Sequence, residues 1–139
     1  MRLMGLDIGT RTIGVAVSDP LGWTAQGITT LRRKQEEQDL AAVAALCQEY
    51  GVEGVVAGLP LHMNGEAGAS VEMVKEFVQK LTEQTGLPIY YQDERLTTVS
   101  AQRVLLEGDV SRKRRKQVVD KLAAVFILQT YLDNPNNIK

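Results

Sequence analysis

Three strand-forming segments occupy the first 32 residues of the chain, and the connections between them are too short to hold a helix. Residues 13–19 alternate between β-branched and small side chains, which is typical of a strand, and residues 2–8 and 24–32 form strand-like segments on either side. Short connections join antiparallel neighbours, so we predict an antiparallel meander. Only folds that open on such a meander are compatible with this chain.

Helical and strand-like segments alternate after the meander. The pattern predicts a helix over 35–50, a strand over 52–58, a helix over 68–85, a strand over 89–93, and helices over 97–107 and 116–132. Residues 59–68 contain the proline and glycines of a loop at a strand end. This order predicts an α/β fold with a mixed five-stranded sheet, in which parallel strands follow the meander and helices cover both faces.

The composition is that of one globular domain. The chain has 139 residues, of which 44% are hydrophobic and 24% charged, so we expect a single domain over 1–139 with a flexible tail over about 134–139. No apolar run approaches the roughly 20 residues that span a bilayer, and no secretory signal opens the chain. We therefore expect a cytoplasmic protein that does not associate with a membrane.

The chain has one cysteine and one histidine. Cys47 shares a helical stripe with Leu40, Val43 and Ala44, which favours core packing over a reactive thiol. His62 lies in the loop over 59–68, where we interpret it as a loop residue rather than a proton-transfer group. Two such residues do not make a zinc site.

Acidic residues stand at the ends of predicted elements. Asp7 ends the first strand, Asp93 and Glu94 end the fifth, and Asp120 lies early in the last helix on the stripe that should pack on the sheet. Each acid alone has a structural interpretation: Asp7 could brace a turn, Glu94 could pair with Arg95, and Asp120 could stabilise a helix N-terminus. Together they would repel one another without a cation, and oxygen ligands suit Mg²⁺ or Mn²⁺.

Positive charge is concentrated in two runs although the net charge is only −1. The runs are Arg32 to Lys34 and, more densely, Arg112 to Lys116. A polyanion could bind at both places, and the alternative is that both are solvated loops.

Four blocks of this sequence resemble the YqgF family, which is also called RuvX. They are GLDIGTRTIGVAVSD at 5–19, VVAGLPLHMNGEAG at 55–68, YQDERLTT at 91–98 and DKLAAVFIL at 120–128, and together they extend over nearly the whole chain. Proteins of this family are described as Holliday junction resolvase-like proteins and as pre-16S rRNA nucleases. The resemblance implies a ribonuclease H-like fold and metal-dependent hydrolysis of phosphodiester bonds.

The resemblance also implies roles for particular residues. Asp7, Glu94 and Asp120 match the catalytic acids that would hold one or two Mg²⁺ or Mn²⁺ ions. Because successive strand residues point to opposite faces, only one of Asp93 and Glu94 can face the metal, and the family motif favours Glu94.

The same resemblance implies a nucleic-acid partner, which we expect to be RNA rather than DNA and to belong to a pre-ribosomal particle. The expected nucleic-acid-binding residues are Arg11 and Arg95 near the scissile phosphate and, along the backbone, Arg112, Lys113, Arg114, Arg115 and Lys116. We expect a monomer or a weak homodimer.

Three alternatives stay open from the sequence. Junction resolution in DNA would need a symmetric dimer. A phosphotransferase is the second alternative, because LDIGT resembles the first phosphate loop of sugar kinases and actin-like ATPases, although a second such loop is missing from the sequence. The third is an adaptor that binds nucleic acid without cleaving it.

Overall fold

The computed structural model describes residues 1–59, 69–93 and 112–134. Its elements follow in the order β1 (Leu3–Ile8), β2 (Thr12–Ser18), β3 (Ala25–Arg32), α1 (Glu36–Tyr50), β4 (Gly54–Leu59), α2 (Ala69–Thr85), β5 (Ile89–Asp93) and α4 (Arg112–Asp133). All predicted elements that fall within these ranges are present. The helix predicted over 97–107 lies outside the described residues.

Two boundaries differ from the sequence prediction. Strand β4 begins at Gly54 rather than at residue 52, because Val52 still donates to the Cys47 carbonyl (3.1 Å) beyond the left-handed Gly51 that caps α1. Helix α4 begins at Arg112 rather than at residue 116, so the basic run forms its first turns. Arginine and lysine are good helix formers, and the loop interpretation of this run was wrong.

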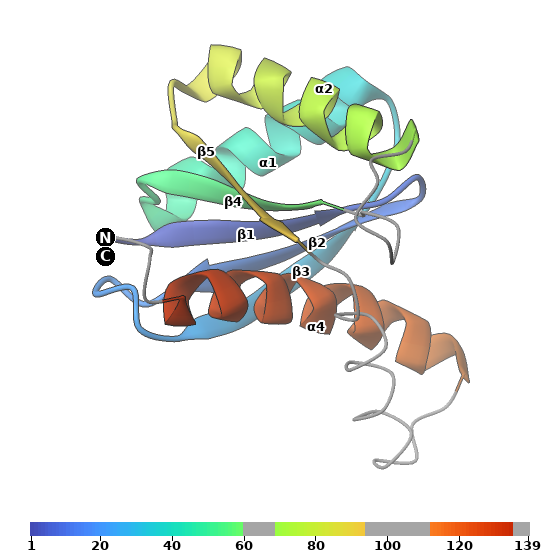
Figure 1. Cartoon of the computed structure of the whole chain (residues 1–139). Helices are drawn as coiled ribbons and strands as arrows, with labels where there is room; N and C mark the ends of the chain where they lie inside the picture. The colour runs from blue at the N-terminus through green and yellow to red at the C-terminus, as the bar shows by residue number, and fades with distance from the viewer. Residues whose placement is uncertain (60–68, 94–111, 135–139) are drawn as a thin grey trace.

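The five strands form one mixed sheet in the order β3-β2-β1-β4-β5. Strand β2 is antiparallel to β1 and β3, which confirms the predicted meander, and β4 is parallel to β1 and β5. Helices α1 and α2 cover one face of the sheet and α4 covers the other (Figure 1). The end of β1 therefore lies in the middle of a sheet with helices on both sides.

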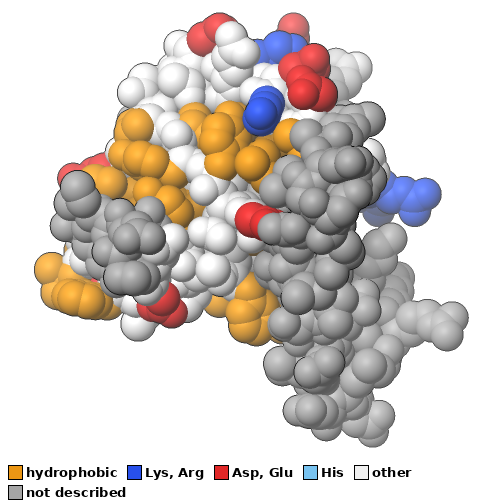
Figure 2. Space-filling view, viewed as in Figure 1, with side chains coloured by type: hydrophobic (Ala, Val, Ile, Leu, Met, Phe, Trp, Pro, Cys, Tyr) orange, Lys and Arg blue, Asp and Glu red, His pale blue; other side chains and the backbone are white. Residues whose placement is uncertain are grey.

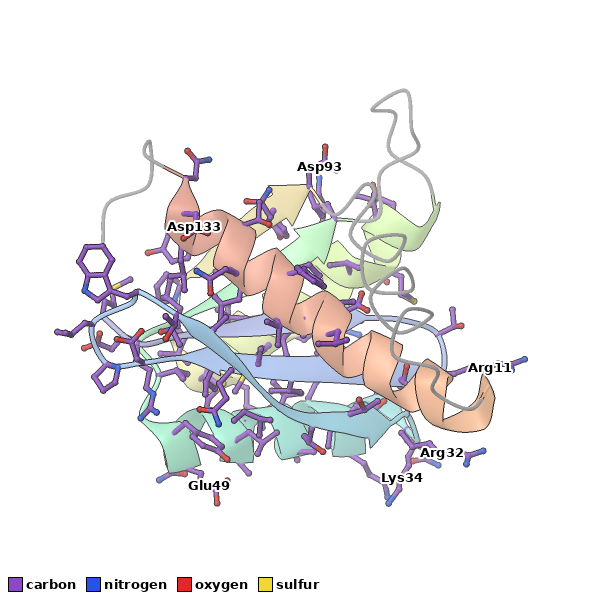
Figure 3. The ribbon with its side chains drawn as sticks, turned by 90° about the horizontal axis from the view of Figure 1, so that it is seen from below. Arg11, Arg32, Lys34, Glu49, Asp93 and Asp133 are labelled. Carbon is purple, nitrogen blue, oxygen red and sulfur yellow. The ribbon has the colours of Figure 1, made fainter. Side chains whose placement is uncertain are left out.

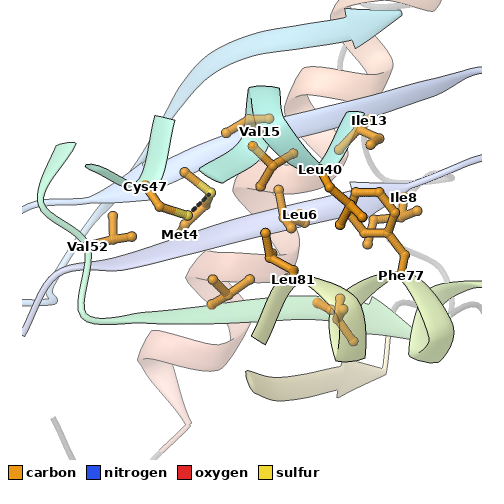
Figure 4. Close-up of a cluster of buried hydrophobic side chains, with 14 of the residues drawn as sticks. Met4, Leu6, Ile8, Ile13, Val15, Leu40, Cys47, Val52, Phe77 and Leu81 are labelled. Atoms are coloured by element: carbon orange, nitrogen blue, oxygen red, sulfur yellow. Dashed lines mark hydrogen bonds between the residues drawn. The ribbon is translucent and has the colours of Figure 1, made fainter. Parts of the chain in front are cut away.

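The larger core lies between the sheet and helices α1 and α2 (Figure 4). It contains side chains from alternate positions of the strands together with one stripe of each helix: Met4, Leu6, Ile8, Ile13, Val15, Val17, Leu40, Val43, Cys47, Val52, Val55, Ala57, Val74, Phe77, Val78 and Leu81. Cys47 lies 3.7 Å from the Met4 sulfur, and burial raises the pKa of the Cys47 thiol to about 11. The core interpretation of Cys47 is confirmed.

The smaller core lies on the α4 face. It is formed by the buried residues Leu3, Ala16, Val56, Ala124, Ile127, Leu128 and Leu132. Helix α4 approaches the sheet closely at Gly5, where a Cβ atom would lie 2.7 Å from the Leu128 Cβ and 3.0 Å from the Ala124 carbonyl oxygen. Only glycine at this position lets the helix pack at that distance.

None of the three described helices combines the length and the apolar sequence that a membrane span requires.

Candidate functional site

Asp7 lies near the end of β1 on the face that α4 covers. Leu3 belongs to the α4 core and Gly5 contacts α4, and strand alternation puts Asp7 on the same side, two residues further along. Its neighbours Leu6 and Ile8 point into the opposite core. The Asp7 residue is half-buried, whereas every other residue of β1 is buried.

Glycines flank Asp7 on both neighbouring strands. Its partner on β2 is Gly14. On β4, the register that pairs Leu6 with Ala57 brings Gly58 next to Asp7. No side chain from either neighbouring strand therefore stands beside the carboxylate in this row of the sheet.

The N-terminal half of α4 passes over Asp7. The helix runs opposite to β1 in Figure 1, and Ala124 and Leu128 lie over Gly5. Two strand residues advance about 6.7 Å and one helical turn about 5.4 Å, so the turn over Asp7 is the one that precedes Ala124. Asp120 belongs to that turn. The structure describes its backbone and not its side chain.

Of the two neighbouring acids Asp93 and Glu94, the structure describes only Asp93. Asp93 pairs with Leu59, which packs against the larger core, so Asp93 lies on the α1 and α2 face. Asp7 lies on the opposite face, and the structure thus separates these two acids. Glu94 and Arg95 lie outside the described residues.

The predicted basic residues divide into three groups. Arg11 is exposed in the β1–β2 turn, at the same end of the sheet as Asp7. The run from Arg112 to Lys116 begins α4 at that end as well (Figure 1), and its side chains lie outside the described part. Arg32 and Lys34 are exposed, whereas Arg33 between them is not.

Arg33 has a different role from Arg32 and Lys34, and the sequence alone did not distinguish it from these neighbours. Its Nε donates to Asp39 Oδ2 (3.1 Å), its Nη1 donates to the Gly9 carbonyl (3.0 Å), and its guanidinium lies 5.2 Å from the centre of the Phe77 ring. The side chain is 14% exposed and that of Asp39 is 6% exposed. Interpreting the whole run over 32–34 as a surface for polyanions was therefore wrong for its middle residue.

Asp39 completes this brace. Its Oδ1 accepts from the Lys34 amide (2.9 Å), which holds the start of α1 against the end of β3. An acid in the first turn of a helix after a basic run is the one sequence signal that could have indicated this pair. The contact with Phe77 depends on the packing of α2 and has no local signal.

Among the side chains that the structure describes, no three His, Cys, Asp or Glu groups lie close enough to hold a metal ion. The Asp120 side chain and Glu94 are outside that set, and so is His62. Among the candidate acids, only the Asp7 and Asp93 side chains are thus described.

Comparison with known proteins gives consistent matches over nearly the whole chain. A family model described as "RuvX: Holliday junction resolvase" matches residues 1–134. A protein of Moorella thermoacetica named "Putative pre-16S rRNA nuclease" is 60% identical over 96% of this chain and 95% of its own length. A protein of Clostridium perfringens with the same name is 57% identical over 96% of this chain and 97% of its own length.

Solved structures share the fold at low sequence identity. Thermus thermophilus RuvC in complex with a Holliday junction substrate matches with a TM-score of 0.59 and 17% identity, over 95% of this chain and 94% of that one. The Fowlpox virus resolvase in complex with Holliday junction DNA matches with a TM-score of 0.60 and 13% identity, over 99% and 100%. These matches confirm the ribonuclease H-like fold, and with the family model and the curated relatives they show that the chain belongs to the RuvX (YqgF) family of Holliday junction resolvase-like nucleases.

Proposed function

We propose that this protein is a metal-dependent nuclease whose catalytic acids are Asp7, Glu94 and Asp120. The observation that carries the proposal is the setting of Asp7: a half-buried carboxylate between Gly14 and Gly58, beneath the α4 turn that contains Asp120. An ion or a phosphate needs close approach to its ligand, and glycines on both sides permit it. Glu94 enters the proposal through the family motif in the sequence, and Asp93, which lies on the other face of the sheet from Asp7, does not.

The donor set fits Mg²⁺ or Mn²⁺. The proposed ligands are all carboxylates, which hard divalent cations prefer. Cys47 is buried and its thiol has a raised pKa, so it is unsuited to serve as a thiolate ligand. When bound, such an ion would activate water and stabilise the charge on the leaving oxygen of a phosphodiester.

The chain's own cations would position the substrate. Arg11 lies in the turn that follows Asp7, and α4 begins with the run from Arg112 to Lys116 at the same end of the molecule. Arginine forms paired hydrogen bonds to phosphate oxygens, and lysine acts as a point charge. With Arg95 they would hold the nucleic-acid backbone, while the acids act on one bond.

The substrate that we favour is the precursor of 16S ribosomal RNA within a pre-ribosomal particle in the cytoplasm. The names of curated relatives that are 55–60% identical to this chain support it. A Holliday junction is the second candidate, since two of the solved structures that share the fold contain one. A nuclease for RNA ends can act as a monomer, whereas paired cuts in a junction require a symmetric dimer.

The test is a cleavage assay on a precursor 16S rRNA end, single-stranded RNA and a four-way DNA junction, each in Mg²⁺, Mn²⁺ and EDTA. Asp7→Asn keeps the shape of the side chain and removes its charge. Asp93→Asn is the matched control, because it removes a carboxylate on the opposite face of the sheet. We expect metal-dependent cleavage of RNA that Asp7→Asn abolishes and Asp93→Asn retains.

Other outcomes would redirect the proposal. Full activity of Asp7→Asn would remove Asp7 from the site, and preferred cleavage of the junction would select the second substrate. Binding without cleavage of any substrate would instead support an adaptor. Tight binding of ATP would support the phosphotransferase.

A further inference from the structure

We propose that Arg11, Arg32 and Lys34 form one phosphate-binding corner that guides the nucleic-acid backbone away from the Asp7 site. The inference rests on the proposed function and adds a second contact surface to it. The three residues are exposed and come from two separate parts of the chain. None of their side chains makes a hydrogen bond or an ion pair with another described residue.

The backbone fixes these residues next to one another. Thr12 pairs with Arg32 in the β2–β3 ladder, and the Arg33 amide donates to the Arg11 carbonyl (2.8 Å). The turn that carries Arg11 is thereby joined to the end of β3. Figure 3 shows Arg11, Arg32 and Lys34 at the same corner of the molecule.

Arg33 explains why its two neighbours face outward. Its guanidinium is directed into the molecule, where it bonds Asp39 and the Gly9 carbonyl, and in an extended segment the flanking side chains point the other way. The Lys34 amide is also bonded to Asp39 (2.9 Å). A buried ion pair thus holds the backbone that presents Arg32 and Lys34.

The charges near this corner leave it positive. Asp39 is neutralised by Arg33, and Glu36 pairs with Lys80. Among the described residues of the α1 first turn, Glu37 is the remaining acid, against the three exposed cations of the corner. A polyanion approaching this corner would be attracted to it.

Two exposed acids lie at the opposite end of the molecule. Figure 3 shows the exposed acids Glu49 and Asp133 far from the Arg11 corner. The cations at that end, the Met1 ammonium and Arg2, donate to the backbone carbonyls of Pro20, Ser18 and Tyr50. Exposed cations that are not held in this way are found at the Arg11 corner, where they would attract phosphates.

The test measures binding of fluorescein-labelled single-stranded RNA and of a labelled four-way DNA junction by fluorescence anisotropy at several salt concentrations. The variant is Arg11→Gln, Arg32→Gln and Lys34→Gln combined. Three lost phosphate contacts should weaken RNA binding roughly 10- to 100-fold at 0.1 M salt and reduce the slope of log K against log salt by about 2. A larger loss for the junction than for RNA would identify the corner as a DNA surface.

Two controls separate charge from other effects. Lys75→Gln removes one exposed cation from α2 and should leave RNA binding unchanged. By contrast, Arg11→Gln, Arg32→Gln and Lys34→Gln made singly should each weaken RNA binding. A variant with Arg11→Lys, Arg32→Lys and Lys34→Arg keeps all three charges and should retain binding. Thermal melting checks that each variant is folded.

An unchanged affinity and salt slope in the folded triple glutamine variant would overturn the inference. The proposed function would still hold if Asp7→Asn abolished cleavage in the same preparation. If instead the unaltered protein neither bound nor cleaved any substrate, the proposed function itself would fail, and the corner would lose its partner with it.

Discussion

The two ends of the sheet hold their chain reversals with different side chains, an arginine at one end and an aspartate at the other. At each end a chain reversal next to β2 is held by side-chain hydrogen bonds. At the Asp7 end, Arg33 holds the β1–β2 turn from inside, and cations face the solvent. At the other end, Asp19 accepts bonds from the amides of Leu21 (3.2 Å), Trp23 (2.7 Å) and Thr24 (2.8 Å).

The surfaces that these reversals present are also different. Leu21 is 68% exposed and Trp23 is 59% exposed in the β2–β3 loop. In Figure 2, hydrophobic side chains lie at the surface where Figure 1 places this loop, and Lys or Arg side chains project at the opposite end. The side chains that hold a turn in place are therefore different from those that the turn exposes to solvent. The exposed side chains are the ones that a ligand can contact.

The largest expected effect separates the two aspartates at the two ends. Asp7→Asn should reduce cleavage by more than the roughly 10- to 100-fold that follows loss of an outer partner of a metal ligand. The Asp19 carboxylate accepts hydrogen bonds from amides of its own loop, far from Asp7. Cleavage by Asp19→Asn should therefore stay within twofold of that by the unaltered protein. Initial rates on a precursor 16S rRNA end measure both. A comparable loss in Asp19→Asn would mean that the ends are not functionally distinct.

The second prediction concerns the brace at the Asp7 end. Arg33→Ala leaves Asp39 buried without its partner and should lower the free energy of unfolding by about 3 kcal/mol. Lys80→Ala breaks an ion pair that is exposed to solvent and should cost much less than Arg33→Ala. Urea denaturation provides both values. Equal costs would show that the Arg33 pair is no more than a surface contact.

The Gln129 contact between α4 and the β2–β3 loop should contribute less to stability than the Arg33–Asp39 pair, because both of its partners are neutral. Gln129 accepts from the Ala25 amide (2.8 Å) and donates to the Trp23 carbonyl (3.1 Å), so it joins α4 to the β2–β3 loop. Gln129→Ala should lower the free energy of unfolding by about 1 kcal/mol, because hydrogen bonds between neutral groups contribute less than those of a buried ion pair. The same denaturation series measures it. A cost above that of Arg33→Ala would show that the neutral Gln129 contact stabilises the fold more than the buried ion pair does.

The pH dependence of stability should come partly from the Asp19 end. The amide of Thr24, and then those of Trp23 and Leu21, lower the pKa of Asp19 below its usual value of 3.8. The folded state therefore binds the proton less readily than the unfolded state. This contribution is complete above the unfolded pKa and is lost as the pH falls through the lowered folded pKa. Melting temperatures between pH 5 and pH 2.5 should fall less in Asp19→Asn than in the unaltered protein, and parallel curves would contradict this.

The smallest effect is expected for the exposed apolar side chains. Leu21→Ser and Trp23→Ser should change the free energy of unfolding by no more than about 0.5 kcal/mol, since both side chains are mainly in solvent. RNA affinity should stay the same in both variants. A drop in RNA affinity for Trp23→Ser would extend the nucleic-acid surface to this end.

The sequence determined which elements form and where Asp7 stands. Alternation in 13–19, short connections and helical stripes depend on neighbours within a few residues, so the meander, the five strands and the core position of Cys47 could all be predicted. The register of a hairpin follows from its short turn as well. The position of Asp7 near the end of the first strand could be predicted for the same reason.

Only the tertiary structure decided what each charge does. Arg32, Arg33 and Lys34 are equivalent in the sequence, and the inward direction of Arg33 depends on Asp39, Gly9 and Phe77. The close approach of α4 to Gly5 likewise depends on residues more than a hundred positions away. Local patterns carry the period of a strand or a helix, but the partner of a buried charge is set by packing between elements, and no local period encodes it.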